Sequence, residues 1–279
     1  MTLLLAAAVG LMAGVHTATW GMYKDAPHEG FSRWKYARSI VLATAIAVIV
    51  SAGWGLDPRR AADLVVLFGA TYAVERALAE IYKTFLRDED QSKYFIPMQF
   101  AIFGKVVRSR GARLLAGAGY VAVLLGMVVL VSWLDRALPG PKPLWLVVAI
   151  GGLGGWISAF GGAWKDAPKE GFQIFKFFRS PIIASLFALG LSNLTDDLVL
   201  VTLAATGFCV ATTETYKTFF FPSKPRGKFA GKPILFPAML RMAALSTPLQ
   251  GSPLDPPVTT SSPETRATRV PLVSVTSQI

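Results

Sequence analysis

Ten charged, small and aromatic residues occur twice in this chain in the same order, within KDAPHEGFSRWKYARS at 24–39 and KDAPKEGFQIFKFFRS at 165–180. A shorter motif also recurs, because EIYKTF at 80–85 returns as ETYKTF at 214–219. Both motifs combine carboxylates with lysines or arginines, which can pair with one another, bind an anion or bind a hard cation. The repeated residues are therefore the first candidates for a functional site.

The simplest interpretation of these charges is structural. An unpaired charge in or near hydrocarbon is costly, so each base is expected to find an acid. We expect Lys35 or Arg38 to pair with Glu80, and the matching bases of the second copy to pair with Glu214. These pairs would hold each KDAP segment against its own group of helices.

A second interpretation is a polar cavity for an anion or a lipid phosphate, since each copy carries one more basic than acidic motif residue. A divalent-cation site is a third, but the lysines between the carboxylates argue against it. The candidate binding residues in the motifs are Asp25, Glu29, Lys35, Arg38, Glu80, Asp166, Glu170, Lys176, Arg179 and Glu214.

One position breaks the match between the copies. Glu75 and Arg76 stand where the second copy has Cys209 and Val210. An arginine inside a membrane helix is a functional-site hypothesis by default, so Arg76 is the candidate for a substrate contact made in one copy only. The alternative is a structural pair with Glu80, four residues later on the same helix.

Four glycines also keep the register of the repeat. Gly10 and Gly14 match Gly151 and Gly155, and each pair is four residues apart on one helix face. Small residues at this spacing allow two membrane helices to approach closely. We therefore expect a packing seam where the first and fifth membrane helices meet.

The motifs are separated by long apolar runs. Hydrophobic residues make up 53% of the chain and charged residues 16%, compared with about a quarter charged in soluble domains. Several runs reach the roughly 20 residues needed to cross a bilayer. Since a lipid-exposed backbone must satisfy its own hydrogen bonds, the sequence predicts an all-α integral membrane protein with seven transmembrane helices.

The two copies predict a 3+1+3 arrangement of parallel repeats, in which a solitary helix at about 114–134 returns the second triple to the orientation of the first. A tail rich in proline, serine and threonine cannot bury a core and is expected to be disordered. The predicted parts are a three-helix repeat at 1–89, a basic cytoplasmic linker with the spacer helix at 90–140, a second three-helix repeat at 141–222, a basic cytoplasmic segment at 223–242 and the tail at 243–279.

Each KDAP segment is predicted to form an elbow, a sharp bend between two helices at the membrane surface. Proline removes a backbone donor and restricts the residue before it, so we expect the first helix to end near Asp25. Gly30 then permits a sharp reversal of the chain. The aromatic side chains of Phe31 and Trp34 would lie at the level of the lipid headgroups.

The net charge of +11 is explained by topology. Most lysines and arginines fall on one side if the N-terminus lies outside and seven helices follow, which predicts a multi-pass protein with a cytoplasmic C-terminus. Nucleic acid is therefore not an expected partner. Cys209 is the only cysteine of the chain, and the two histidines lie in different contexts, so no metal site and no cofactor is predicted.

The sequence favours a transporter or channel for a small anionic solute, with a site between the two three-helix bundles near the cytoplasmic side. An alternative is a protein that binds phospholipid headgroups, either as a lipid carrier or as a lipid-modifying enzyme, with anionic membrane lipids as partners. A further alternative is a scaffold subunit that transports nothing. No Ser/His/Asp constellation or phosphate-cradling glycine loop is present, which argues against an enzyme, and a homo-oligomer is compatible with the sequence.

Overall fold

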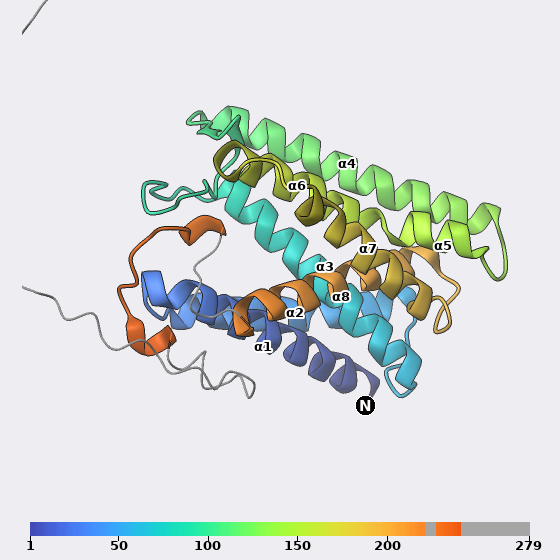
Figure 1. Ribbon diagram of the computed structural model, residues 1–279. Coiled ribbons are helices and arrows are strands. Elements are labelled where there is room, and N and C mark those ends of the chain that lie inside the picture. Colours follow the sequence, from blue (N-terminus) through green and yellow to red (C-terminus); the bar gives the residue numbers. More distant parts are fainter. Residues whose placement is uncertain (221–226, 241–279) are drawn as a thin grey trace, which may run out of the picture. The chain divides into compact units, whose positions relative to one another are not determined.

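The computed structural model describes residues 1–220 and 227–240, and these residues are mostly helical. The predicted tail at 243–279, together with parts of the predicted segments at 141–222 and 223–242, lies outside the described residues. The α-helices, shown in Figure 1, are α1 (Thr2–Glu29), α2 (Arg33–Trp54), α3 (Ala61–Ile81), α4 (Arg110–Ala137), α5 (Leu144–Gly151), α6 (Leu153–Glu170), α7 (Ile174–Leu191) and α8 (Leu198–Phe219).

Six helical stretches of the described residues are long and apolar enough to cross a membrane: α1, α2, α4, the consecutive pair α5 and α6, α7 and α8. These stretches fit a multi-pass membrane protein. Helix α3 is also 21 residues long, but it carries Asp63, Glu75, Arg76 and Glu80 and is not one of the six. The seven-helix 3+1+3 arrangement is therefore not confirmed and stays a prediction.

Helix α4 covers the residues predicted for the spacer and runs along one side of the bundle (Figure 1). Only 11% of its most apolar stretch is buried within the protein. Its outward leucine and valine side chains, such as Leu115 and Val129, are exposed. A surface of this apolar composition suits contact with lipid tails, because it makes no hydrogen bonds with water.

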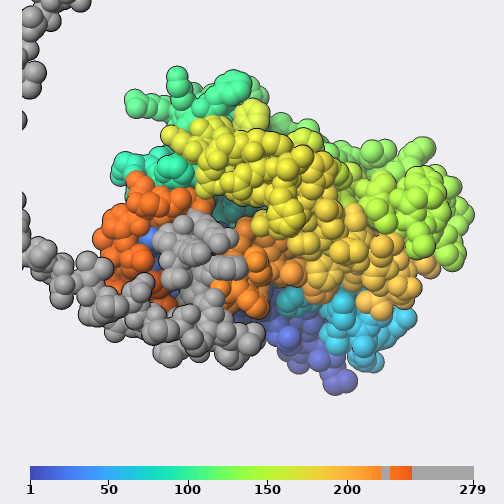
Figure 2. Space-filling model, in the orientation of Figure 1, coloured from blue at the N-terminus to red at the C-terminus, as the bar shows by residue number. Residues whose placement is uncertain are grey.

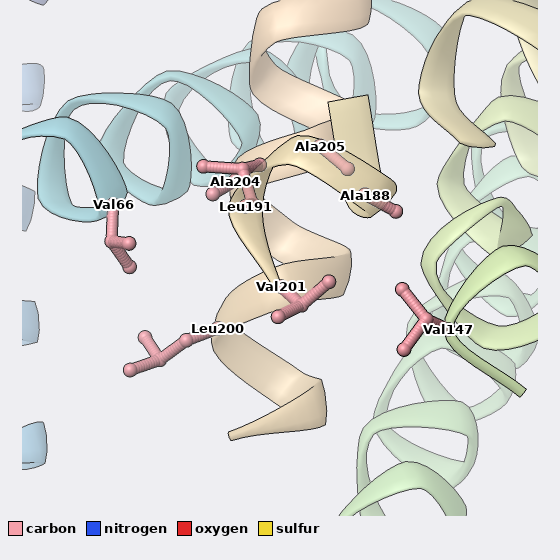
Figure 3. Close-up of a cluster of buried hydrophobic side chains, with 8 residues drawn as sticks. All are labelled: Val66, Val147, Ala188, Leu191, Leu200, Val201, Ala204 and Ala205. Carbon is pink, nitrogen blue, oxygen red and sulfur yellow. The ribbon is translucent and has the colours of Figure 1, made fainter. Parts of the chain in front are cut away.

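Helices α3 and α8 cross at the centre of the bundle (Figure 1). Gly69 and Gly207 bring the two backbones together, because a Cβ at 207 would lie 1.9 Å from the carbonyl oxygen of Gly69. Small residues continue along α8, where Ala204 and Ala205 are fully buried. Figure 3 shows these alanines in a cluster to which α3, α5 and α7 contribute Val66, Val147, Ala188 and Leu191.

The glycines predicted to join the first and fifth membrane helices pack elsewhere. A Cβ at Gly10 or Gly14 would meet the backbone of α2, and one at Gly155 would meet Ser180 and Pro181 of α7. Gly151 packs against the Ala188 side chain, also on α7. The expected partner helix was therefore wrong, because each glycine pair lets consecutive helices of one copy approach closely, and the centre is built by α3 and α8.

Both KDAP segments fold alike. Helix α1 continues through Pro27 to Glu29, so the expected break near Asp25 is wrong. A proline in the last turn removes a single helical hydrogen bond, a cost that the remaining turn tolerates. Gly30 ends the helix with φ 78°, and Gly171 ends α6 at the same φ of 78°, as the sharp reversal requires.

Two further segments complete the motif end of the bundle. After α3 a π-helical turn, η1 (Tyr82–Leu86), leads to a short antiparallel hairpin of β1 (Ala101–Ile102) and β2 (Lys105–Val106). This hairpin is a small departure from the all-α prediction. The second segment, 227–240, begins with the 3-10 turn η2 (Gly227–Phe229).

Candidate anion-binding site

The first lysine of each KDAP copy forms an ion pair with the other copy. Lys24 Nζ lies 3.1 Å from Glu214 Oε2, and Lys165 Nζ lies 3.1 Å from Glu80 Oε2. Lys165 also donates to the Thr84 hydroxyl at 3.2 Å. In each pair the KDAP lysine of one copy meets the glutamate of the other copy. These two ion pairs therefore join the two sequence copies at one end of the bundle.

The second lysine of each copy stays within its own segment. Lys35 Nζ lies 2.7 Å from Glu29 Oε2, and Lys176 Nζ lies 2.9 Å from Glu170 Oε2, with Asp166 as a second partner. The reversal at the elbow places these lysines over the acids of the same segment. The predicted pairing of Glu80 with Lys35 or Arg38, and of Glu214 with Lys176 or Arg179, is therefore wrong.

Glu80 and Glu214 each form a second ion pair, with the lysine three residues later in the same copy. Lys83 Nζ lies 3.2 Å from Glu80 Oε1, and Lys217 Nζ lies 2.9 Å from Glu214 Oε1. A carboxylate held between two ammonium groups is already neutralised. Neither Glu80 nor Glu214 is therefore free to bind a cation, which argues against the divalent-cation interpretation.

Arg76 is buried, as expected for a charged side chain inside a helical bundle, but its partner differs from the prediction. Its Nε lies 2.7 Å from Glu75 Oε2, and a second guanidinium nitrogen donates to Glu75 Oε1 at 3.2 Å. The guanidinium also lies over the Trp20 ring, 5.2 Å from its centroid. The pair with Glu80, which was the structural alternative, does not form, because the neighbouring carboxylate makes a bidentate contact.

A cavity of about 90 Å³ lies between the ends of α1 and α2 and the residues that follow α3. One water needs about 10–15 Å³ of such space, so a small oxyanion or a few waters fit. Trp20, Phe31 and Tyr36 contribute aromatic walls. The charged lining comprises two acidic side chains and six basic ones: Asp25, Glu29, Lys35, Arg38, Arg76, Lys83, Arg87 and Lys228.

Most of these basic groups have a carboxylate partner, but two guanidinium groups keep unused donors. Arg38 forms no ion pair with any residue in 1–220 or 227–240, and it lies over the Tyr82 ring at 5.8 Å. Arg87 forms an ion pair with Glu89 through a terminal nitrogen, but its Nε is buried and lacks a hydrogen-bond partner within the same residues. Guanidinium groups offer paired donors that match the oxygens of a carboxylate, sulfate or phosphate.

The segment at 227–240 supplies one wall of the cavity. Lys228 Nζ lies 2.8 Å from Asp25 Oδ2, and the Lys228 carbonyl accepts a hydrogen bond from Phe95 N at 2.7 Å. Phe229 is buried and stacks on the His28 ring at the end of α1, with centroids 4.3 Å apart. Figure 2 shows this segment in dark orange beside the loop that follows α3.

Two titratable groups outside the membrane helices are perturbed here. Burial lowers the pKa of Lys83 to about 8; the positive charges of Arg76 and Lys228 act in the same direction, and Glu80 opposes them. Tyr94 donates its hydroxyl proton to Glu29 Oε1 at 2.8 Å. Burial and the nearby Glu29 raise the pKa of Tyr94, so it stays a neutral donor.

The structure brings only part of the predicted site together. The cavity is lined by the predicted residues Asp25, Glu29, Lys35, Arg38 and Arg76. Glu80 does not line it, but it forms an ion pair with the lining residue Lys83. The second-copy residues do not line it: Asp166, Glu170, Lys176, Arg179 and Glu214. The cavity therefore belongs to the first copy and does not lie between the two predicted bundles.

The lining residues that sequence reasoning missed include Trp20, Arg87 and Lys228. Trp20 lies one turn before Lys24 on α1, so the spacing on a helix face offered a signal. Arg87 and Lys228 are 141 residues apart in the chain and belong to no repeated motif. Only the folded arrangement identifies them.

Within the residues that the structure describes, no group of three or more His, Cys, Asp or Glu side chains is placed to hold a metal ion. Comparison with known proteins adds no assignment: no family model matches the chain, and no curated protein or solved structure matches it. The cavity and its charges are therefore the features that indicate a function.

Proposed function

We propose that the protein is a membrane transporter or channel for a small oxyanion, and that the cavity is the anion's binding site at the cytoplasmic end. In this proposal α3 is the seventh membrane span, the N-terminus lies outside and the C-terminus is cytoplasmic. The clustering of lysines and arginines at the motif end of the helices supports that orientation, because basic residues favour the cytoplasmic side.

The observation that carries the proposal is the pair of guanidinium groups in the cavity wall. Arg38 has no carboxylate partner in the described part of the chain, and Arg87 Nε is buried without an acceptor. An anion in the cavity would supply the acceptor that the Arg38 guanidinium lacks. The other basic side chains of the lining each have a carboxylate partner, so Arg38 carries the excess positive charge of the cavity.

The close crossing of α3 and α8 bears on the path of the anion. Because Gly69 and Gly207 are in backbone contact, a route between the two predicted three-helix bundles has no room at their centre. We infer that the anion passes along the groups lining α1 and α2 of the first copy. This differs from the expected site between the bundles.

The decisive experiment measures binding of sulfate, an anion that does not titrate near neutral pH. The full-length protein in nanodiscs of uncharged lipid is titrated calorimetrically, and uptake of labelled sulfate into liposomes is followed in parallel. Arg38→Gln is expected to weaken binding by roughly 10- to 100-fold, the equivalent of a lost hydrogen bond to a charged group.

Arg179→Gln is the matched control, because Arg179 occupies the position that corresponds to Arg38 in the second motif but does not line the cavity. It should bind sulfate as the unmodified protein does. If both variants lose binding equally, or if the unmodified protein neither binds nor transports sulfate, phosphate or a small carboxylate, the proposal is wrong.

A second candidate function is binding of an anionic phospholipid, and one feature of the structure favours it. The outer face of α2 carries an apolar groove lined by Ile40, Val41, Thr44, Ala45, Val48 and Ile49, which begins next to the cavity residues Arg38 and Ser39. A phosphate at Arg38 would place an acyl chain along this groove. Phe31 and Trp34 are exposed at the same elbow, a position typical of interfacial anchors.

The two candidates differ in what displaces the anion. For a lipid site, phosphatidylglycerol in the nanodisc should block sulfate binding, and Val48→Trp in the groove should weaken the lipid alone. For a solute site, sulfate affinity should be the same in neutral and anionic nanodiscs once the bulk surface charge is screened by salt.

A further inference from the structure

A chain of polar contacts leads from the cavity wall into the bundle. Trp20 lines the cavity, and its Nε1 donates to the Tyr72 hydroxyl at 2.6 Å. His16 Nδ1 lies 3.1 Å from the same hydroxyl, and His16 Nε2 lies 3.0 Å from the Thr215 hydroxyl on α8. A histidine within a membrane helix thus connects α1 with both central helices.

The contacts of His16 satisfy a neutral ring. Trp20 can only donate, so the Tyr72 oxygen accepts from it and the Tyr72 proton is available to donate to His16 Nδ1. In that tautomer Nε2 carries the ring proton and donates it to Thr215. The neutral ring is therefore satisfied at both nitrogens.

The same surroundings accept a charged ring. After protonation Nδ1 also becomes a donor, and the Tyr72 hydroxyl accepts from it and turns its own proton toward the hydroxyl of Thr17, a second hydrogen-bonding neighbour of Tyr72. No carboxylate contacts His16 in residues 1–220 or 227–240.

This chain of contacts exists in one copy only. At the offsets of the two repeated motifs, the positions that match His16, Trp20, Tyr72 and Thr215 hold apolar or small residues, respectively Ile157, Gly161, Thr206 and Ile81. Packing alone would be served by apolar side chains, as at the matching positions. The one-sided occurrence of a titratable group beside the one-sided cavity indicates a role in function.

We propose that His16 is a proton-binding site coupled to the anion cavity, so that an anion and a proton bind together. This inference rests on the proposed anion-binding function and specifies how it is regulated. A proton taken up at Nδ1 converts the ring to an imidazolium. Its positive charge lies one helical turn before Trp20, which lines the cavity, and attracts the anion. By linkage, the bound anion must favour protonation of His16 to the same extent.

The charges that face His16 from neighbouring helices are already paired. On α3, Glu75 binds Arg76, and Tyr72 stays a hydroxyl donor and acceptor. On α8, Glu214 lies between Lys24 of α1 and Lys217. On α2, Tyr36 contacts the Thr19 hydroxyl at 3.1 Å, and Arg38 faces the cavity. His16 is therefore the side chain in this environment that can take up a proton without breaking an ion pair.

The test uses the fact that the sequence contains two histidines. In His28→Gln the remaining imidazole signal belongs to His16, and glutamine retains a donor for the Pro233 carbonyl that His28 contacts at 2.8 Å. Nitrogen NMR of this variant in nanodiscs should show a neutral His16 ring that takes up a proton as the pH is lowered. Saturating sulfate should move the midpoint to higher pH.

Sulfate affinity gives the functional readout below the titration range of Lys83. Between about pH 5.5 and 7, affinity should rise as pH falls in the unmodified protein and in His28→Gln, at most about tenfold per pH unit for one linked proton. His16→Gln should bind sulfate with no such dependence.

Three results would overturn the coupling: a His16 ring that does not titrate, a midpoint that sulfate does not move, or the same pH dependence in His16→Gln. If sulfate binds with an affinity that is flat in pH, the coupling fails and the anion site stands. If no variant binds sulfate at any pH, the proposed function fails and the coupling fails with it.

Discussion

The crossing of α3 and α8 provides the sharpest test of the fold, through Gly207→Ala. A Cβ at this position would lie 1.9 Å from the Gly69 carbonyl oxygen and 3.1 Å from Ala73 N. An ordinary contact needs at least 3.4 Å. The two helices must therefore separate by about 1.5 Å, which removes dispersion contacts along the whole crossing.

The expected cost follows from comparison with a second glycine. Gly161→Ala on α6 introduces the same methyl group where no atom lies within 4 Å. Both variants gain the same helix propensity, about 0.5–1 kcal/mol, so the difference between them isolates the steric cost. Overpacking costs about 1–3 kcal/mol, and a backbone separation of this size belongs at the upper end, about 3 kcal/mol.

The assay is unfolding of the full-length protein by sodium dodecyl sulfate in mixed micelles, followed by tryptophan fluorescence. Gly207→Ala should unfold at a clearly lower fraction of the denaturing detergent than Gly161→Ala. Equal midpoints would show that α3 and α8 do not approach one another at Gly69, and the central position of this crossing would have to be abandoned.

Three further predictions concern the motif end of the bundle. A double-mutant cycle of Lys24→Ala and Glu214→Ala should give a coupling energy of about 1 kcal/mol in the same unfolding assay, because both side chains are only partly exposed. Additive effects of the two substitutions would show that the ion pair does not stabilise the protein. Sulfate affinity should fall as pH rises through about 8, where Lys83 loses the charge that attracts the anion, while Lys83→Arg should keep its affinity to higher pH. Phe229→Ala removes a buried side chain that also stacks on His28. The loss of this buried side chain costs about 3 kcal/mol, which should greatly speed proteolysis of residues 227–240 and leave cleavage elsewhere unchanged.

The elbows show how closely local sequence anticipates local structure. The sharp reversals expected at the KDAP motif occur at Gly30 and Gly171 with the same φ of 78°, because glycine alone adopts such a conformation without strain. The position of the helix end was wrong by about one turn. Proline weakens a helix without deciding where it stops, and the stop is set by the residue that leaves the helical conformation.

The ion pairs show the opposite case. Glu80 could pair with the lysine at 35, 83 or 165, since all three belong to repeated motifs. Lysine and glutamate side chains are long, so each of these pairs could form at a similar cost in conformational entropy. Pairs of this kind differ by less than about 1 kcal/mol, so their choice follows the backbone packing that brings Lys165 close and turns Lys35 toward Glu29.

By itself, the sequence determined the helical character, the apolar stretches long enough to cross a membrane, the duplicated motifs, the chain reversals and the concentration of basic residues near the helix ends. These features depend on hydropathy, glycine conformation and local spacing, which act over a few turns of chain. Only the tertiary structure decided which helices cross, which acids and bases pair, and that Arg87 and Lys228 line the same cavity. Lipid tails are as apolar as leucine, so hydropathy does not distinguish a helix face that packs against protein from one that faces lipid, and contacts between distant segments appear only after the helices have packed.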